Sequence, residues 1–176
     1  MQTDSKTLLV MLLETENPAK ETVVKRVREW GAHVAHIVMT EGCEMEAIAV
    51  VTILALIQYF VFGYQVGQMR VKHGVRAPAI VGAPEFERMF RVQQNTLEQI
   101  VIFIPALWIY GEYVHPLWGA AIGLVFIVGR FLYKSGYVAD PSKRSPGFIV
   151  CTVSVSILLL AGLWGAGSEL YSQYMN

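Results

Sequence analysis

Residues 47–69 form an unbroken run that contains no charged side chain. As an α-helix with a rise of about 1.5 Å per residue, this run is long enough to cross the hydrocarbon core of a bilayer, which is roughly 30 Å thick. The composition agrees, because 54% of the residues are hydrophobic and only 16% are charged, which is unusual for a protein that folds in water. The sequence therefore predicts an integral membrane protein.

Three further helices are expected after this first span. The second begins near Pro84, is polar as far as residue 99 and is largely apolar over residues 100–113, so its first turns should project from the bilayer. The third covers residues 116–133 and the fourth covers residues 147–170. We expect an all-α membrane protein, a bundle of four transmembrane helices that run alternately up and down.

The positions of lysine and arginine predict how this bundle is oriented. Basic residues occur between the first and second spans and between the third and fourth, whereas the short turn at residues 112–116 has none. They are Arg70, Lys72, Arg76, Arg88, Arg91, Lys134, Lys143 and Arg144. Because cytoplasmic loops carry an excess of such residues, we expect both basic loops on the cytoplasmic side of a bacterial inner membrane or of the endoplasmic reticulum.

Residues 1–44 differ from the rest of the chain because they are polar and of mixed charge. They have the features of neither a signal peptide nor a spanning segment. A biological start at Met39 or Met45 would make the upstream residues non-native. We therefore expect two parts, a dispensable or non-native extension at residues 1–44 and a membrane domain at residues 45–176.

Charge and cysteine content exclude several classes of protein. The formal net charge is zero, so nothing predicts a nucleic-acid partner. Cys43 and Cys151 are the only cysteines, and no Cys/His cluster accompanies them. Neither a disulfide framework nor a metal site is therefore expected.

Two of the expected helices carry polar and ionisable residues gathered on one face. Spacings of three and four residues put the set on the second helix within an arc of roughly 80°, and the set on the third within about 100°. These residues are Arg88, Arg91, Asn95 and Glu98 on the second helix, and Arg130, Tyr133, Lys134 and Tyr137 on the third. Ionisable groups in membrane segments usually face the protein interior or a polar cavity, so the two stripes predict one polar site.

Several arginines, one carboxylate, an amide and two phenols suit a small zwitterionic ligand with an excess of carboxylates. Glutathione is such a ligand, because its carboxylates match guanidinium groups, its ammonium matches Glu98 and its peptide amides match Asn95 and the tyrosines. A simpler interpretation is an ion pair between Glu98 and Arg130, with the other cations reaching the lipid headgroups. That interpretation does not explain why Asn95 and Glu98 lie deeper than Arg91 on the same face.

Two longer motifs resemble those of a known family. The first is FERMFRVQQNTLE at residues 86–98, and the second is IVGRFLY at residues 127–133 followed by DPSKRS at residues 140–145. The first resembles the signature of the MAPEG family, the membrane-associated proteins in eicosanoid and glutathione metabolism. The second is similar to the microsomal glutathione transferase type 3 branch of that family.

The resemblance implies a homotrimer of four-helix protomers that binds glutathione between neighbouring protomers near the cytoplasmic side. It implies glutathione contacts from Arg70, Arg91, Gln93, Asn95, Glu98, Arg130, Tyr133 and Tyr137. It also gives Arg144 the catalytic role of holding the glutathione sulfur as a thiolate. A nearby cation is needed because a free thiol, with a pKa of about 8.5, is mostly protonated at neutral pH. Since Lys143 lies beside it, Arg144 as an ordinary loop cation remains the alternative.

The predicted activity is a glutathione-dependent transferase or peroxidase that takes lipophilic electrophiles or lipid hydroperoxides from the surrounding membrane lipid. Two positions depart from the pattern of the family's leukotriene C4 synthases, because Gln99 replaces a tyrosine and Val71 replaces a second arginine. The alternative is a non-catalytic protein that binds and presents lipid, like the five-lipoxygenase-activating protein, for which a complete glutathione-binding set would be unnecessary. A channel or transporter subunit lacks support, because no pair of spans is broken at mid-membrane.

Overall fold

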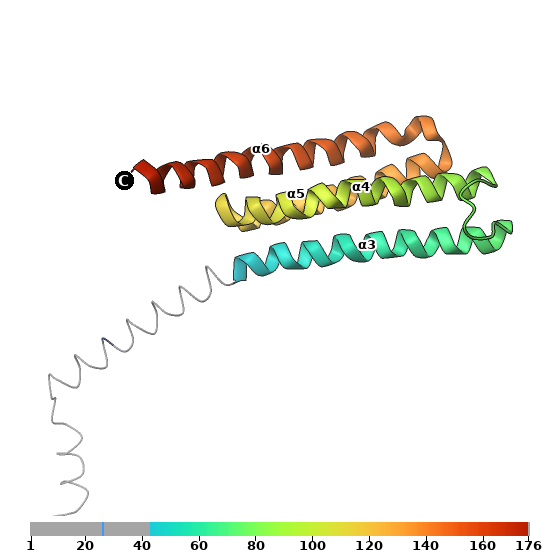
Figure 1. The fold of residues 1–176 in the computed structure, drawn as a ribbon, viewed down its shortest axis with the longest axis horizontal. Helices are drawn as coiled ribbons and strands as arrows, with labels where there is room; N and C mark the ends of the chain where they lie inside the picture. Colours follow the sequence, from blue (N-terminus) through green and yellow to red (C-terminus); the bar gives the residue numbers. More distant parts are fainter. Residues whose placement is uncertain (1–25, 27–42, 176) are drawn as a thin grey trace, which may run out of the picture. The chain divides into compact units, whose positions relative to one another are not determined.

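The computed structural model describes residue 26 and residues 43–175. The expected extension at residues 1–44 therefore lies almost wholly outside the described residues. Within residues 43–175 every regular element is a helix (Figure 1). The elements are α3 (Cys43–His73), α4 (Pro84–Tyr113), α5 (Pro116–Ala139), the short 3₁₀ helix η2 (Pro141–Arg144) and α6 (Ser145–Met175). The predicted all-α fold and its helix order are confirmed.

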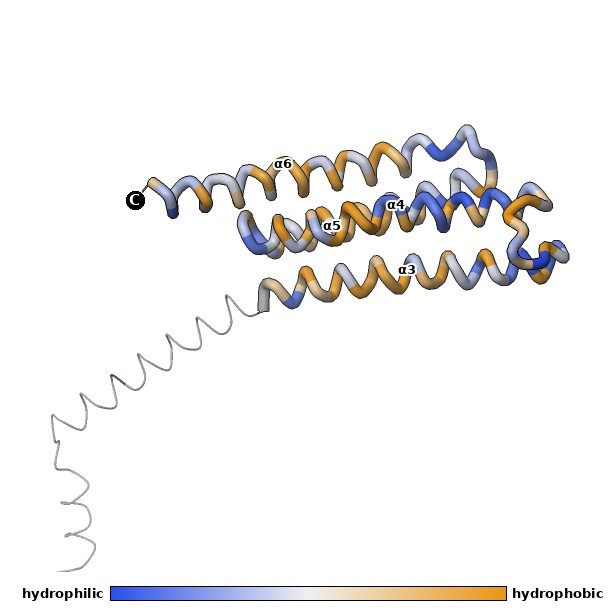
Figure 2. Tube along the Cα trace, in the orientation of Figure 1, coloured by the Kyte–Doolittle hydropathy of each residue, from blue (hydrophilic) through white to orange (hydrophobic). Residues whose placement is uncertain are grey.

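Three of the four long helices, α3, α5 and α6, are long and apolar enough to cross a membrane. The helix α4 is 30 residues long, but its first half is hydrophilic, as the blue segment of the tube in Figure 2 shows. Both α3 and α6 extend beyond their expected bounds and reach 31 residues each. The uncharged runs of the sequence therefore mark the parts that fit a bilayer, and the helices continue past them.

Local sequence explains where the helices begin and end. Pro84 and Pro116 occupy the first turns of α4 and α5, where the missing N–H of proline costs no helical hydrogen bond. The helix α3 ends at His73 and is followed by Gly74, whose φ of 66° is left-handed. The Val75 N–H then donates to the Arg70 carbonyl at 3.0 Å. Glycine suits this closing position because it has no Cβ to clash there.

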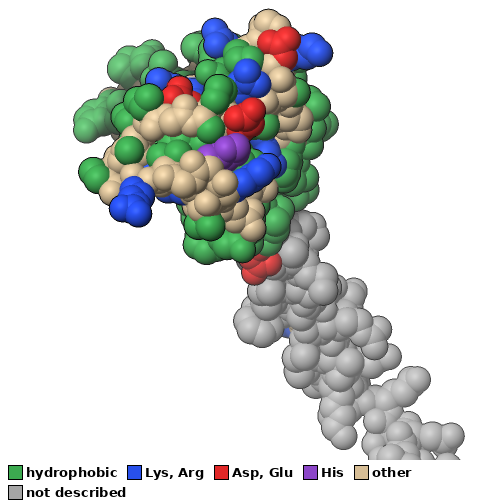
Figure 3. Space-filling model, turned by 90° about the vertical axis from the view of Figure 1, so that its right-hand side faces the viewer, with side chains coloured by type: hydrophobic (Ala, Val, Ile, Leu, Met, Phe, Trp, Pro, Cys, Tyr) green, Lys and Arg blue, Asp and Glu red, His purple; other side chains and the backbone are tan. Residues whose placement is uncertain are grey.

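The helices alternate in direction, so the two basic connections lie at the same end of the bundle (Figure 1). At this end are the loop between α3 and α4 and the 3₁₀ helix η2, whereas the α4–α5 turn lies at the opposite end. Figure 3 looks onto the basic end, where Lys and Arg side chains gather among acidic and hydrophobic ones. We call this the basic end.

Two buried clusters hold the helices together. The larger contains Phe103 and Phe126, whose rings stack with centroids 3.9 Å apart and an angle of 8° between their planes. The smaller, toward the basic end, contains Phe62, Phe86 and Tyr133. Buried aromatic rings of this kind contribute large contact areas, so they fix how α4 and α5 face each other.

Glycine allows α5 and η2 to approach α6 and each other closely. A Cβ added at Gly136 would overlap the carbonyl of Lys143, and one added at Gly147 would overlap the backbone of Tyr133. Neither neighbour is a flexible side chain that can move aside. These glycines therefore let η2 fold back against the end of α5.

Candidate functional site

The centre of the polar site is Arg130, a wholly buried arginine on α5. Its Nη1 donates to Asn95 Oδ1 at 3.1 Å, and its Nη2 donates to Thr96 Oγ1 at 2.6 Å, both on α4. Its guanidinium also lies over the Tyr133 ring, 4.4 Å from the centroid. Burial of a charge costs several kcal/mol unless hydrogen bonds compensate it. These contacts provide part of that compensation, while Arg130 Nε is buried without a partner among the described residues.

Asn95 links this buried arginine to the protein surface. Its Oδ1 accepts from Arg130, while its Nδ2 donates to Glu98 Oε2 at 3.2 Å. Glu98 itself is exposed. The simpler interpretation placed a direct ion pair between Glu98 and Arg130. In the structure Asn95 links them instead, because Arg130 donates to Thr96 and Asn95.

Thr96 is the residue of this network that sequence reasoning missed. It is fully buried, donates to the Val92 carbonyl at 2.6 Å and accepts from Arg130. A polar residue beside Asn95 in the α4 motif was the available signal. Threonine in a helix often bonds only its own backbone, so its type alone did not reveal an interhelical partner.

Three further residues of the predicted site are gathered around η2. Tyr137, in the last turns of α5, stacks on Tyr133 with ring centroids 5.6 Å apart. Arg144, the last residue of η2, is exposed and has its Cζ 5.8 Å from the centre of the Tyr137 ring. The two phenols and Arg144 therefore form a continuous row that leads outward from Arg130.

Asp140 caps the start of η2. Its carboxylate accepts the Ser142 N–H at 2.9 Å, and the Lys143 N–H donates to the Asp140 carbonyl at 2.9 Å. The Ser142 N–H, assisted by the nearby cations Lys143 and Arg88, holds the pKa of Asp140 below its ordinary value of 3.8. The carboxylate is ionised at neutral pH and fixes the turn that carries Arg144.

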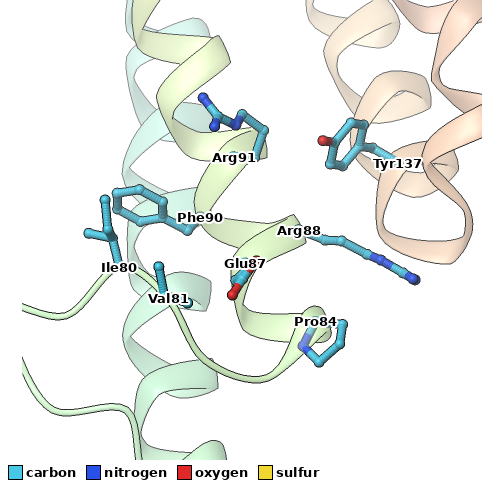
Figure 4. A pocket seen from close by; sticks show the side chains of 8 residues that line it. All are labelled: Ile80, Val81, Pro84, Glu87, Arg88, Phe90, Arg91 and Tyr137. Atoms are coloured by element: carbon cyan, nitrogen blue, oxygen red, sulfur yellow. The ribbon is translucent and has the colours of Figure 1, made fainter.

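A cavity of about 350 Å³ opens at the basic end between α4, the α3–α4 loop and Tyr137. Figure 4 shows Arg91 and Tyr137 on neighbouring helices beside this hollow. Its lining combines apolar and charged side chains: Ile80, Val81, Pro84, Glu87, Arg88, Phe90, Arg91 and Tyr137. A polar ligand with several charged groups is compatible with such a lining.

Two predicted residues have different surroundings. Arg70 donates to the Ala79 carbonyl at 2.6 Å and stacks over Phe86, 4.7 Å from the ring centre. Gln93 donates to the Tyr59 hydroxyl on α3 at 2.6 Å. Neither lines the cavity that Arg91 and Tyr137 line. Within one protomer, Arg91 and Tyr137 line the cavity, Asn95 and Glu98 belong to the network of Arg130, and Arg70 and Gln93 contact α3 or its following loop.

The family was settled by comparison with known proteins. The model of the MAPEG family matches residues 48–164, which include both motifs of α4 and α5. The chain belongs to the MAPEG family. The predicted family membership is therefore confirmed, and the match includes every residue of the predicted site.

Relatives of this MAPEG protein share most of its membrane domain. Microsomal glutathione S-transferase 2 of Homo sapiens is 40% identical over 129 residues, which are 73% of this chain and 88% of the relative. An uncharacterised protein of Synechocystis is 43% identical over 65% of this chain and 84% of its own length. Leukotriene C4 synthase of Cavia porcellus is 37% identical over 57% of this chain and 67% of its own. The resemblance to the type 3 branch stays a prediction.

Proposed function

We propose that this MAPEG protein is a glutathione S-transferase whose glutathione lies at the basic end of the bundle. The observation that carries the proposal is that Arg91 and Tyr137 line one cavity while the Arg144 guanidinium lies over the Tyr137 ring. Support comes from the 40% identity to a protein named microsomal glutathione S-transferase 2. Glutathione is the co-substrate in this proposal.

Each charged group of glutathione has a complementary group in the site. Exposed Arg91 offers an unshielded guanidinium for a carboxylate. Glu98 and the amide of Asn95 offer acceptors for the ammonium and the peptide N–H groups. In this scheme buried Arg130 does not touch the ligand but orients the Asn95 amide, because its Nη1 donates to Asn95 Oδ1 at 3.1 Å. The resemblance implies that Arg130 also contacts glutathione directly. For that contact, the ligand would have to displace the Asn95 side chain from Arg130.

The site is completed by a neighbouring protomer in this proposal. Arg70 and Gln93 belong to the group that contacts α3 or its loop and lie outside the cavity. In a homotrimer, a neighbour's copies of these two residues would reach the ligand that Arg91 and Asn95 bind. Chemical cross-linking in mild detergent should give trimers, and a monomer as the largest species would contradict this arrangement.

The chemistry begins with the glutathione thiol, because the thiolate is the nucleophile. Arg144 is the proposed catalytic residue, since arginine keeps its charge in a partly desolvated site and favours the anionic sulfur. A hydroxyl such as that of Tyr137 can donate a hydrogen bond to the same sulfur. The thiolate then attacks a lipophilic electrophile from the lipid and displaces its leaving group. With a lipid hydroperoxide it attacks the O–O bond, the lipid alkoxide leaves and takes a proton from water, and the glutathione sulfenic acid reacts with a second glutathione to give the disulfide and water.

The membrane setting follows from the four helices. In this proposal all four cross the bilayer, with the polar first turns of α4 projecting from the cytoplasmic face and its apolar half, residues 100–113, packed among the other helices. Positive residues at the basic end favour the cytoplasmic side. Val71, where leukotriene C4 synthases have a second arginine, is 86% exposed and has no proton to donate, so electrophiles that need no acid assistance are favoured.

The test compares Arg144→Ala with Glu98→Ala in purified protein. Glutathione binding is followed by calorimetry, and the thiolate by its ultraviolet absorbance as a function of pH. Arg144→Ala should raise the thiol pKa by about one unit, equivalent to about 1.4 kcal/mol, and lower turnover, with affinity largely kept. Glu98→Ala should instead weaken glutathione binding, because the ligand ammonium loses its partner.

Two outcomes would count against the proposal. If Arg144→Ala forms thiolate at the wild-type pH midpoint, Arg144 has no role in the mechanism. If the wild type neither binds glutathione nor turns over a chloronitrobenzene or a hydroperoxide, the alternative of a protein that only binds and presents lipid takes its place.

A further inference from the structure

The C-terminal end of α5 requires hydrogen-bond donors from elsewhere. The last carbonyls of any α-helix lack partners within the helix. At this end, the Gly136 carbonyl accepts the Asp140 N–H at 2.8 Å. The carbonyls of Val138 and Ala139, close to the end of the helix, accept from Nη1 of Arg88 at 3.2 Å and 3.3 Å. A side chain of α4 therefore caps α5.

Arg88 differs from Arg91 in where its guanidinium goes. Both residues line the cavity, but Figure 4 shows the Arg88 side chain extending toward the end of α5, away from Phe90 and Ile80. A cation at a helix C-terminus also interacts favourably with the partial negative charge of the helix dipole. The guanidinium of Arg88 is therefore held by hydrogen bonds to backbone carbonyls, whereas exposed Arg91 remains available to a ligand.

The segment that Arg88 holds carries the proposed thiolate chemistry. Tyr137 lies immediately before the capped carbonyls, and η2, which ends at Arg144, follows immediately after them. Asp140 and Gly136 make this segment compact. Among the described residues, no other side chain of α4 donates a hydrogen bond to this end of α5. Arg88 is thus the polar link between the helix of Arg91 and the segment of Tyr137 and Arg144.

We infer that Arg88 is a positioning residue that keeps Tyr137 and Arg144 in register with Arg91, so that it controls formation of the glutathione thiolate rather than binding of glutathione. The inference rests on the proposed function and extends it to a residue outside the predicted glutathione contacts. A rival role, direct binding of a glutathione carboxylate, makes the opposite prediction, because it affects affinity first.

The experiment uses the full chain with Arg88→Ala, Arg88→Lys and, as a matched control, Arg76→Ala. Arg76 is an exposed cation of the α3–α4 loop that does not line the cavity. The pH midpoint of thiolate absorbance, the glutathione Kd, and kcat and KM are measured for each protein. Thermal unfolding in detergent shows which variants are folded.

Arg88→Ala should raise the thiolate midpoint by about half a unit, leaving roughly threefold less thiolate at a fixed pH below the midpoint. Its glutathione Kd should stay within about twofold of the wild type, and kcat should fall with the thiolate. Arg88→Lys should recover much of the loss, because an ammonium can also donate to the two carbonyls. Arg76→Ala should match the wild type in all measurements.

A glutathione Kd weakened tenfold with an unchanged thiolate midpoint would make Arg88 a ligand contact and overturn the inference. Wild-type behaviour of Arg88→Ala would overturn it as well. If Arg88→Ala does not fold, Arg88→Lys decides: a lysine variant that is folded but shows the full rise in midpoint contradicts a role as carbonyl donor. If the wild type itself forms no thiolate, the proposed function is refuted. This outcome is distinguishable from failure of the inference about Arg88, in which the wild type forms thiolate as expected.

Discussion

In the second half of α4, residues 100–113, the buried side chains are aromatic or aliphatic, and Phe103 stacks on Phe126. In the first half, residues 84–99, the buried positions include Thr96, which contacts the charged Arg130. The second half is held mainly by close packing, whereas the first half adds donors and acceptors in fixed directions to the packing of Phe86 and its neighbours. Substitutions in the apolar region should therefore act on folding, and those in the polar region on the site.

The largest effect is expected where helices meet without side chains between them. A Cβ at Gly165 of α6 would overlap the carbonyl of Tyr113 at the end of α4. Gly165→Leu should cost about 3 kcal/mol or more, the upper range for overpacking, and abolish folded protein in detergent. Gly167→Leu is the matched control, because a Cβ there meets nothing within 4 Å. Equal thermal stability of the two variants would contradict tight packing at this end.

Arg130→Met tests the network of the polar half of α4, where we expect a substitution to weaken ligand binding and not to change stability. Methionine fills a similar volume, and removing the guanidinium also removes the cost of its desolvation, which offsets the loss of its hydrogen bonds to Asn95 and Thr96. We expect a melting temperature close to the wild type but glutathione binding weaker by roughly tenfold, or about 1.4 kcal/mol, because Asn95 loses its donor. Calorimetry alongside thermal unfolding measures both. Collapse of the fold would make Arg130 a residue of stability instead.

A smaller effect is expected from Thr96→Val, which removes one acceptor of Arg130 and keeps the shape. The unpaired donor should cost about 1 kcal/mol of stability, and glutathione affinity should fall only a few-fold because the bond to Asn95 remains. Thr52→Val is the matched control, since Thr52 on α3 accepts from Trp108 at 3.0 Å far from the Arg130 network in sequence. The control should lose stability without any change in glutathione affinity.

Asp140 offers a test by pH. Its folded pKa lies below the ordinary value of 3.8, so its stabilisation of η2 is complete above that value and is lost as the pH falls through the lowered pKa. The thiolate titration of the wild type near neutral pH should therefore contain no contribution from Asp140. Asp140→Ala should raise the thiolate midpoint less than Arg144→Ala does, and Asp140→Asn, which keeps an acceptor for Ser142, less still. If Asp140→Ala leaves the pH midpoint of thiolate formation unchanged, the turn of η2 has no role in stabilising the thiolate.

The smallest effect is predicted for a chain that begins at Met45. It keeps all the predicted site residues and the matched family segment, residues 48–164, and should bind glutathione as the full chain does. Loss of binding, measured by calorimetry, would assign residues 1–44 a role in the site.

Much of this fold could be predicted because the signals are local. Uncharged runs predicted the helices, and Pro84 and Pro116 marked the beginnings of two of them. The stripe on α4 could be predicted from residue spacing alone. The contacts of each polar residue could not be predicted in this way, because they depend on how α5 is rotated against α4. That rotation is fixed by the stacking of Phe103 on Phe126 and by other buried contacts.

Arg130 illustrates the limit of sequence reasoning. Its position on α5 predicted that it belongs to the site, but not that it is 0% exposed with Thr96 as a partner. Arg88 was part of the predicted stripe, yet its contact with the end of α5 depends on where that helix stops. Helix ends extended past the uncharged runs, so this contact had no sequence signal.

The pairing of Arg130 with α4 also bears on how the chain enters its membrane. Synthesis proceeds from the N-terminus, so the segment with Val92, Asn95 and Thr96 leaves the ribosome before Arg130 does. An arginine on an isolated helix is costly in hydrocarbon, but here its acceptors have already been made when it arrives. The order of the helices along the chain thus lets α5 insert beside α4, which already carries the acceptors of Arg130. With the two helices in reversed order, the guanidinium would be exposed to lipid before its acceptors were made.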